Sequence, residues 1–389
     1  MPLTLPFSLA AGLPDALSSL TLAAEPGAAD RTLVVVFLRG GADGLSIAPP
    51  LGDPDYRRLR PLLGIEAREC LALDGFFGLH PLLKPLEKCW KNGDLALVHA
   101  AGSDDDSRSH FVAQDLMEHG GNSVAGGWLG RWLGAMAARS DAAQGGLPAL
   151  SLGTNLAESL RSAPSASVLQ SLDDLGLGAD AAAVRPALED LYAGDEMLGP
   201  AAHQACTALD RLAQVRGAPY TPAAGAEYSA DAFSQGLRLL ARLIKAGVGV
   251  QAATVDLGNW DGHALQPTLI APLLRALGGG LSAFAADLGP KLATTSVVVM
   301  TEFGRRVGEN SALGCDHGRG GAMFVLGGGV AGGVHGRWPG LTDTALDGPG
   351  DLAVTSDYRD VLAPVLLRHG DAGALAAAFP GRTGAALAL

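Results

Sequence analysis

The chain has 389 residues, of which 48% are hydrophobic and 17% are charged, and its formal net charge is -12. A chain of this length and composition can bury a large core, which excludes a disordered or coiled-coil protein. The acidic balance argues against nucleic acid as a partner, because phosphate backbones select basic surfaces. A small anionic substrate needs only local positive charge and remains the expected partner.

Short apolar runs alternate with helical patterns along the chain, an order typical of a mostly parallel sheet covered on both faces. Strands are predicted at Arg31 to Arg39, Leu95 to Ala101, Leu147 to Leu152, Val248 to Leu257, Thr295 to Thr301 and Ala322 to Leu326. Helices are predicted at about Ser109 to His119, Ala179 to Val215, Tyr228 to Ala246, Leu265 to Leu288 and Ser356 to His369. We therefore predict one α/β domain over residues 31–389, with a helical insertion at about 155–225.

Residues 1–30 are apolar and rich in alanine but contain no Lys or Arg. A secretory signal needs a positive first segment, so we predict an N-terminal arm or the remainder of a trimmed leader, and localisation stays open. We expect no integral membrane segment, because no apolar run looks long enough to span a bilayer.

The four cysteines, Cys70, Cys89, Cys206 and Cys315, form no C-x-x-C pair. This spacing makes a thiolate zinc site or a thioredoxin-type motif improbable. We expect buried free thiols, with a Cys70–Cys89 disulfide as the alternative for an exported protein.

Polar side chains follow four of the predicted strands where each strand ends, and another group precedes the last strand. In an open parallel sheet the carboxyl ends of the strands share one edge, where ligands bind. We therefore expect residues far apart in the sequence to converge there: Asp43, Arg108, Ser109, His110, Asp261, His263, Glu302 and Arg305. A further candidate pair, Asp316 and His317, lies in the loop just before the last predicted strand.

The carboxylates and imidazoles of this set are ligand types for divalent metals. They suit zinc, manganese, iron, calcium or magnesium, and no cysteine lies among them. A metal in such a place can polarise a phosphoryl or sulfuryl oxygen. We predict one or two ions, held by Asp43, Asp261, His263, Glu302, Asp316 and His317.

Ser109 lies at the predicted start of a helix, where free backbone N–H groups favour an anion. A hydroxyl nucleophile would be stabilised there, so Ser109 is the predicted nucleophile. Arg108 and Arg305 could hold the non-bridging oxygens of a substrate. His110 completes the catalytic candidates, as a residue that supports the site.

Each of these residues also has a purely structural interpretation. Asp43 could form a turn, and Ser109 could cap a helix. Glu302 could pair with Arg305, and Asp316 could orient an imidazole instead of binding the ion.

Five ordered motifs resemble those of a known bacterial family. They are RGGADGL (Arg39 to Leu45), RSHF (Arg108 to Phe111), NWDGH (Asn259 to His263), TEFGR (Thr301 to Arg305) and DHGRGG (Asp316 to Gly321). Together they resemble the domain of unknown function 1501 family, a sulfatase-like branch of the alkaline phosphatase superfamily. The resemblance runs from about residue 32 to 367, and it implies an alkaline phosphatase-like α/β fold.

The resemblance also implies roles for individual residues. Asp43 resembles an aspartate that binds one metal, and Ser109, or less favourably Ser107, lies where the nucleophile is expected. Asp261, His263 and His317 resemble the ligands of the other metal. Glu302 stands near an expected Asp-His pair, but Phe303 replaces the histidine, which puts one of the two sites in doubt.

Two further departures concern the DTH pattern and the leader. The family usually has DTH where this chain has Asp261-Gly262-His263, so Gly262 should loosen that loop without removing a ligand. Members commonly carry a twin-arginine export leader to the periplasm, and this chain shows none.

These expectations favour a metal-dependent hydrolase of phosphate or sulfate esters. One alternative is a non-catalytic metal- or ligand-binding protein with a degenerate site, which Phe303 supports. Another is a metalloenzyme of a different class, such as a mutase or a redox enzyme. The sequence predicts neither the substrate nor the oligomeric state.

Overall fold

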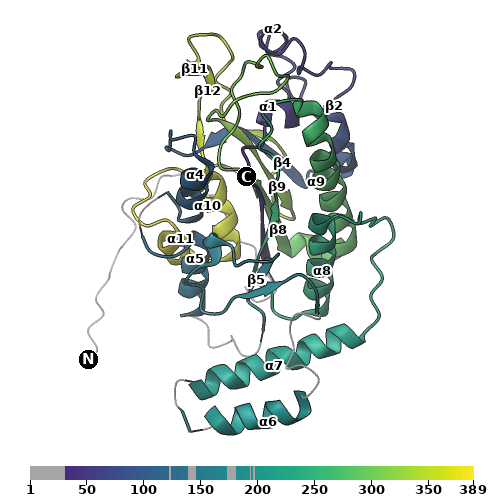
Figure 1. Ribbon diagram of the computed structural model, residues 1–389, viewed down its shortest axis with the longest axis vertical. Coiled ribbons are helices and arrows are strands. Elements are labelled where there is room, and N and C mark those ends of the chain that lie inside the picture. Colours follow the sequence, from purple (N-terminus) through teal and green to yellow (C-terminus); the bar gives the residue numbers. More distant parts are fainter. Residues whose placement is uncertain (1–30, 122–123, 139–145, 173–180, 193, 196–197) are drawn as a thin grey trace, which may run out of the picture.

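The computed structural model describes residues 31–389 except 122–123, 139–145, 173–180, 193 and 196–197. The predicted N-terminal arm, residues 1–30, lies outside the described residues. A central sheet lies between two helical layers, with the α6–α7 pair below it in Figure 1.

The central sheet has nine strands in the order β10-β4-β9-β8-β1-β7-β5-β6, with β13 also paired to β4. Its strands are β1 (Thr32–Leu38), β4 (Leu95–Gly102), β5 (Ala149–Leu152), β6 (Ser167–Leu169), β7 (Ala252–Leu257), β8 (Thr295–Met300), β9 (Gly321–Gly327), β10 (Gly333–His335) and β13 (Ser356–Asp357). Two small pairs lie outside it: β2 (Leu71–Ala72) with β3 (Gly78–Leu79), and β11 (Leu346–Asp347) with β12 (Asp351–Leu352). All six predicted strands are confirmed.

Strand β9 runs against its neighbours. It pairs antiparallel with β4 and β8, whereas the other described pairings of the sheet are parallel. The sheet is therefore mixed and mostly parallel, as predicted. Because β9 is reversed, the loop before it lies at the same edge as the carboxyl ends of β1, β4, β7 and β8.

Helices cover both faces of the sheet, and α6 and α7 lie apart from them as a pair. The helices are α1 (Gly44–Ile47), α2 (Tyr56–Leu59), α3 (Glu87–Lys91), α4 (His110–Glu118), α5 (Trp128–Ala137), α6 (Ala181–Tyr192), α7 (Leu198–Gly217), α8 (Ala232–Ala246), α9 (Gln266–Leu288), α10 (Tyr358–His369) and α11 (Ala372–Ala378), with 3-10 turns η3 (Pro81–Leu86), η4 (Glu158–Leu160) and η6 (Gly289–Thr294). The stretch predicted as one helical region from Ala179 to Val215 contains two helices, α6 and α7. These lie within the predicted insertion.

Side chains of β1 alternate between two hydrophobic cores. Val34, Val36 and Leu38 join the core under α8 and α9, whereas Leu33, Val35 and Phe37 join the core under α5, α10 and α11. A strand that is buried on both faces has a continuous run of apolar residues, which explains why the sequence predicts a strand at Arg31 to Arg39. Figure 1 shows α8 and α9 on one side of the sheet and α4, α5, α10 and α11 on the other.

One segment of the described chain, Gln266–Thr294, is long and apolar enough to cross a membrane by length and composition alone. By that criterion, the expectation that no apolar run is long enough to span a bilayer was wrong. More than half of its most apolar window, 56%, is buried inside the protein. Leu277, Leu281 and Phe284 of this segment belong to the core between α9 and the sheet.

All four cysteines are free, and Cys89, Cys206 and Cys315 are buried. The prediction of free thiols is confirmed, and the alternative Cys70–Cys89 disulfide is not formed. Burial raises the pKa of the Cys315 thiol to about 12, so this side chain stays a neutral packing group.

Candidate metal centre

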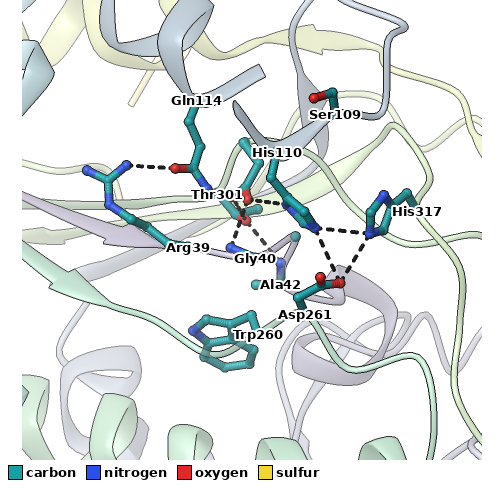
Figure 2. Close-up of polar contacts among 12 residues, drawn as sticks. Arg39, Gly40, Ala42, Ser109, His110, Gln114, Trp260, Asp261, Thr301 and His317 are labelled. Carbon is teal, nitrogen blue, oxygen red and sulfur yellow. Dashed lines mark hydrogen bonds and ion pairs between the residues drawn. The ribbon is translucent and has the colours of Figure 1, made fainter. Parts of the chain in front are cut away.

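Four donor atoms converge at the carboxyl edge of the sheet, from the loops after β7, the start of α4 and the loop before β9. His317 Nε2 lies 3.0 Å from Nε2 of His110 and 3.0 Å from Nε2 of His263. Asp261 Oδ1 lies 3.3 Å from His110 Nε2, 3.0 Å from His263 Nε2 and 3.1 Å from His317 Nε2. Figure 2 shows His110, His317 and Asp261 turned toward one another. We call these four residues the histidine cluster.

The other nitrogen of each imidazole in the histidine cluster faces an oxygen that can only accept a hydrogen bond. His110 Nδ1 lies 2.7 Å from Glu302 Oε1, and His317 Nδ1 lies 2.9 Å from the main-chain oxygen of Arg108. His263 Nδ1 lies 3.3 Å from Asp316 Oδ1. Nδ1 therefore carries a proton in each ring, and Nε2 faces the centre, where it offers a lone pair when the ring is neutral.

This arrangement fits a divalent cation. Five of the six separations among these four atoms are 3.0–3.3 Å, and the ligand atoms of His110, Asp261 and His317 all lie within 4.8 Å of one another. Ligands about 2.0–2.1 Å from a tetrahedral zinc ion lie roughly 3.3 Å apart, close to the separations observed here. The residues that could hold the ion are His110, His317 and Asp261, with His263 in contact with two of them.

Neighbouring groups keep two carboxylates ionised, that of Asp261 in the histidine cluster and that of Glu302 beside it. Burial opposes ionisation of Asp261, but the hydrogen bond and the charge of Arg305 hold the pKa of its carboxyl well below the usual range. Glu302 is buried too, and hydrogen bonds from His110 and Gln114 lower its pKa. The hydrogen bond to Glu302 in turn raises the pKa of His110.

Glu302 orients the histidine cluster from outside it. Its Oε1 accepts bonds from His110 Nδ1 at 2.7 Å, the Gly40 N–H at 2.8 Å and Gln114 Nε2 at 2.8 Å. Its Oε2 accepts from the Thr301 hydroxyl at 3.1 Å. Glu302 is thus bonded to His110 and not to Arg305, the partner that the structural alternative assigned to it.

Phe303 packs against the histidine cluster. Its ring centroid lies 4.8 Å from that of His110 and 5.1 Å from that of His317. The residue that replaces an expected histidine therefore restrains two imidazoles by contact and offers no ligand.

Asp43 is paired with Arg60 and has no contact with the histidine cluster. Both side chains are buried, and Arg60 Nη1 and Nη2 lie 2.6 and 3.1 Å from the two carboxylate oxygens. Ser46 and Gln266 also donate to Asp43, which caps α1 through the Leu45 N–H. Burial opposes ionisation, but the Arg60 charge holds the pKa of Asp43 low. The structure supports the turn-forming interpretation of this residue.

The two predicted substrate-binding arginines are bonded to the protein. Arg305 is buried and donates to the main-chain oxygens of Gly40, Gly41, Trp260 and Cys315 and to Asp261 Oδ1. Arg108 Nε donates to buried Asp351 at 2.9 Å, and its own carbonyl holds His317. Both arginines position the histidine cluster.

Ser109 occupies the N-cap position of α4, as predicted, but its hydroxyl makes no capping hydrogen bond. In Figure 2 no contact joins Ser109 to the histidine cluster. The Ser109 side chain therefore shows neither the hydrogen bond of a helix cap nor a contact expected of a nucleophile with the histidine cluster.

Sequence reasoning missed three supporting residues. Gln114 and Thr301 both bond Glu302, and Asn310 Nδ2 lies 3.2 Å from Asp316 Oδ1 and 3.0 Å from the His263 carbonyl oxygen. Gln114 follows His110 by four residues on a predicted helix, which places both on one face. That spacing was the available signal.

These features define an α/β protein with a mostly parallel sheet and a candidate metal centre at its carboxyl edge. The chain belongs to the family described as "Protein of unknown function (DUF1501)", whose model matches residues 96–370. The match includes four of the five motifs, and only RGGADGL precedes it.

Among solved structures, the chain is similar to one titled "Structure of PH0037 protein from Pyrococcus horikoshii". The two share 12% sequence identity over 91% of this chain and 98% of that chain, with a TM-score of 0.33. This likeness is too weak to carry information on function. No curated protein shows significant similarity to the chain.

Replacing Gly304 by Ala should loosen the centre. A Cβ at Gly304 would lie 1.9 Å from the Gly320 carbonyl oxygen, so the loops that carry Arg305 and His317 must separate. We expect a loss of about 1–3 kcal/mol in the free energy of unfolding, together with less bound metal. Urea unfolding and elemental analysis measure both quantities.

Gly308→Ala is the matched control, because a Cβ there meets nothing within 4 Å. It should change stability by no more than about 0.5 kcal/mol. Equal behaviour of the two variants would contradict the prediction.

Replacing Asp43 by Asn should destabilise the fold by roughly 3–5 kcal/mol, because it leaves the buried Arg60 charge without its partner. The effect should be complete above pH of about 4, the ordinary pKa of Asp, and should shrink as pH falls through the lowered pKa of folded Asp43. Urea unfolding across pH measures it. Asp343→Asn, whose side chain is 89% exposed beside Arg58, should change little. A similar loss in both variants would refute the prediction.

Proposed function

We propose that this protein is a metal-dependent hydrolase of phosphate or sulfate esters, from the sulfatase-like branch of the alkaline phosphatase superfamily. The observation that carries the proposal is the convergence of three imidazole Nε2 atoms on Asp261 Oδ1. The order of the five motifs supports the superfamily assignment.

The donor set favours zinc, manganese or iron over calcium and magnesium, which prefer oxygen ligands. It also favours one ion over two. The carboxylate of Asp43 already has a cation in Arg60, and Phe303 supplies no ligand where the resemblance implies a histidine.

A divalent ion bound by the histidine cluster would polarise a phosphoryl or sulfuryl oxygen and acidify a water molecule. The protein's own residues prepare the site. Glu302 and the Arg108 carbonyl fix His110 and His317 in the tautomer that leaves Nε2 free. Arg305 fixes Asp261. Ser109 is the proposed nucleophile, since it adjoins His110 and its hydroxyl is not held by a capping bond.

Two other functions keep specific support. A non-catalytic metal-binding protein is favoured by the engagement of Arg108 and Arg305 with protein groups, because neither guanidinium is free for an ester anion. A metalloenzyme of another class is favoured by the ligand set, since three imidazoles and a carboxylate also suit redox-active metals.

Purified protein should contain about one equivalent of a transition metal, and His317→Ala should lose it. His317 contacts the other three members of the histidine cluster, so its removal breaks the donor set. Elemental analysis measures this content. His203→Ala, an exposed position on α7, is the matched control and should keep the metal. Metal-free wild-type protein that takes up no zinc, manganese or iron would defeat the proposal.

Metal-loaded protein should hydrolyse at least one of p-nitrophenyl phosphate, bis-p-nitrophenyl phosphate and p-nitrophenyl sulfate. Ser109→Ala should keep the metal and lower kcat by roughly 10³-fold or more, because the nucleophile is removed. Full metal content without turnover on any ester would favour the binding protein. Turnover that survives in Ser109→Ala would exclude the serine as nucleophile.

A further inference from the structure

Three exposed leucines lie in, or directly after, the loops that carry Asp261, His263 and His317. Leu265, Leu269 and Leu313 are 58%, 49% and 37% exposed, and we call them the apolar ledge. Leu265 follows His263 by two residues, and Leu313 precedes Asp316 by three. Leu265 and Leu269 are one helical turn apart, and the Leu269 N–H donates to the Leu265 carbonyl oxygen at 3.2 Å.

Two of these leucines adopt a backbone conformation that leucine avoids. Leu265 has φ of 46° and Leu313 has φ of 59°, both in the left-handed region. Branched side chains are disfavoured there, whereas glycine and asparagine tolerate it. A strained, solvent-exposed leucine contributes little to folding. Such positions concentrate at ligand-binding sites.

Main-chain hydrogen bonds join the segments of the apolar ledge to each other, beside the candidate metal ligands His263 and His317. The Leu265 N–H donates to the Ala312 carbonyl at 2.9 Å, and the Gln266 N–H donates to the Leu313 carbonyl at 2.8 Å. A Cβ at Gly314 would lie 2.3 Å from the His263 carbonyl oxygen, so the two loops are in direct contact.

Gly262 brings the ledge against the ligand loop itself. A Cβ at Gly262 would lie 3.2 Å from Leu269 Cδ1, so the glycine between Asp261 and His263 leaves room for this side chain. The residue that departs from the DTH pattern therefore lies under one of the ledge leucines.

We propose that the apolar ledge receives the hydrocarbon part of an amphiphilic substrate whose anionic ester group lies at the histidine cluster. The proposal rests on the proposed function. It names an alkyl or aryl ester as the substrate class. Covering the exposed leucines with hydrocarbon removes apolar surface from water, which favours binding.

The test is calorimetric titration of metal-loaded protein with methyl-, butyl- and octylphosphonate, below the concentration at which octylphosphonate forms micelles. Kd should fall about two- to fourfold for each added methylene that the ledge covers. The double variant Leu265→Asn/Leu313→Asn should flatten this dependence and leave the Kd of methylphosphonate unchanged.

Asparagine tolerates the left-handed conformation, so the double variant should unfold at no lower urea concentration than wild type. Leu191→Asn, on α6 with 69% exposure of the leucine, is the matched control and should keep the wild-type chain-length dependence.

The outcomes separate the two proposals. If methylphosphonate binds but chain length has no effect, or if the dependence survives in the double variant, the inference about the ledge is wrong and the anion site stands. If no phosphonate binds to metal-loaded protein, the phosphate-ester form of the proposed function fails and the inference falls with it.

Discussion

The buried guanidinium of Arg305 joins the loops on which the candidate centre depends. It donates to carbonyl oxygens of Gly40 and Gly41 after β1, of Trp260 after β7 and of Cys315 before β9. A buried charge must be solvated by protein groups, and the five N–H donors of arginine match carbonyls from several directions. The same guanidinium bonds Asp261, so one side chain fixes both the loop framework and a candidate ligand.

The reversed direction of β9 brings the loop before this strand to the same edge of the sheet as the loops after β1 and β7. In a wholly parallel sheet the segment before that strand would lie at the opposite edge, and His317 could not meet His110. Because β9 pairs antiparallel with β4 and β8, the segment just before β9 lies at the carboxyl edge of the parallel strands. This segment carries His317. An isolated bridge between Arg305 and His317 then connects the two loops directly.

Much of this arrangement could be predicted, for identifiable reasons. Continuous apolar runs gave the strands, and the shared edge of parallel strands predicted that His110, Asp261 and His263 converge. Local patterns do not encode strand direction, so the reversal of β9 was not foreseen. The Asp43–Arg60 pair was missed because Arg60 lies in an irregular segment without periodicity, and its burial depends on tertiary contacts. The bond from His317 to the Arg108 carbonyl depends on the left-handed backbone of Arg108, with φ of 51°.

The two carboxylates that resemble metal ligands differ in how their charge is balanced. Asp43 faces a guanidinium of the same chain, which cannot dissociate, so the loop after β1 keeps its conformation whether or not an ion is bound. Asp261 shares Arg305 with four carbonyls and faces three imidazole nitrogens that a bound cation would draw together. The fold should therefore not require metal, whereas the geometry of the histidine cluster should. Under the proposed function, metal dependence would therefore lie in the three segments that carry His110, His263 and His317, beside the apolar ledge.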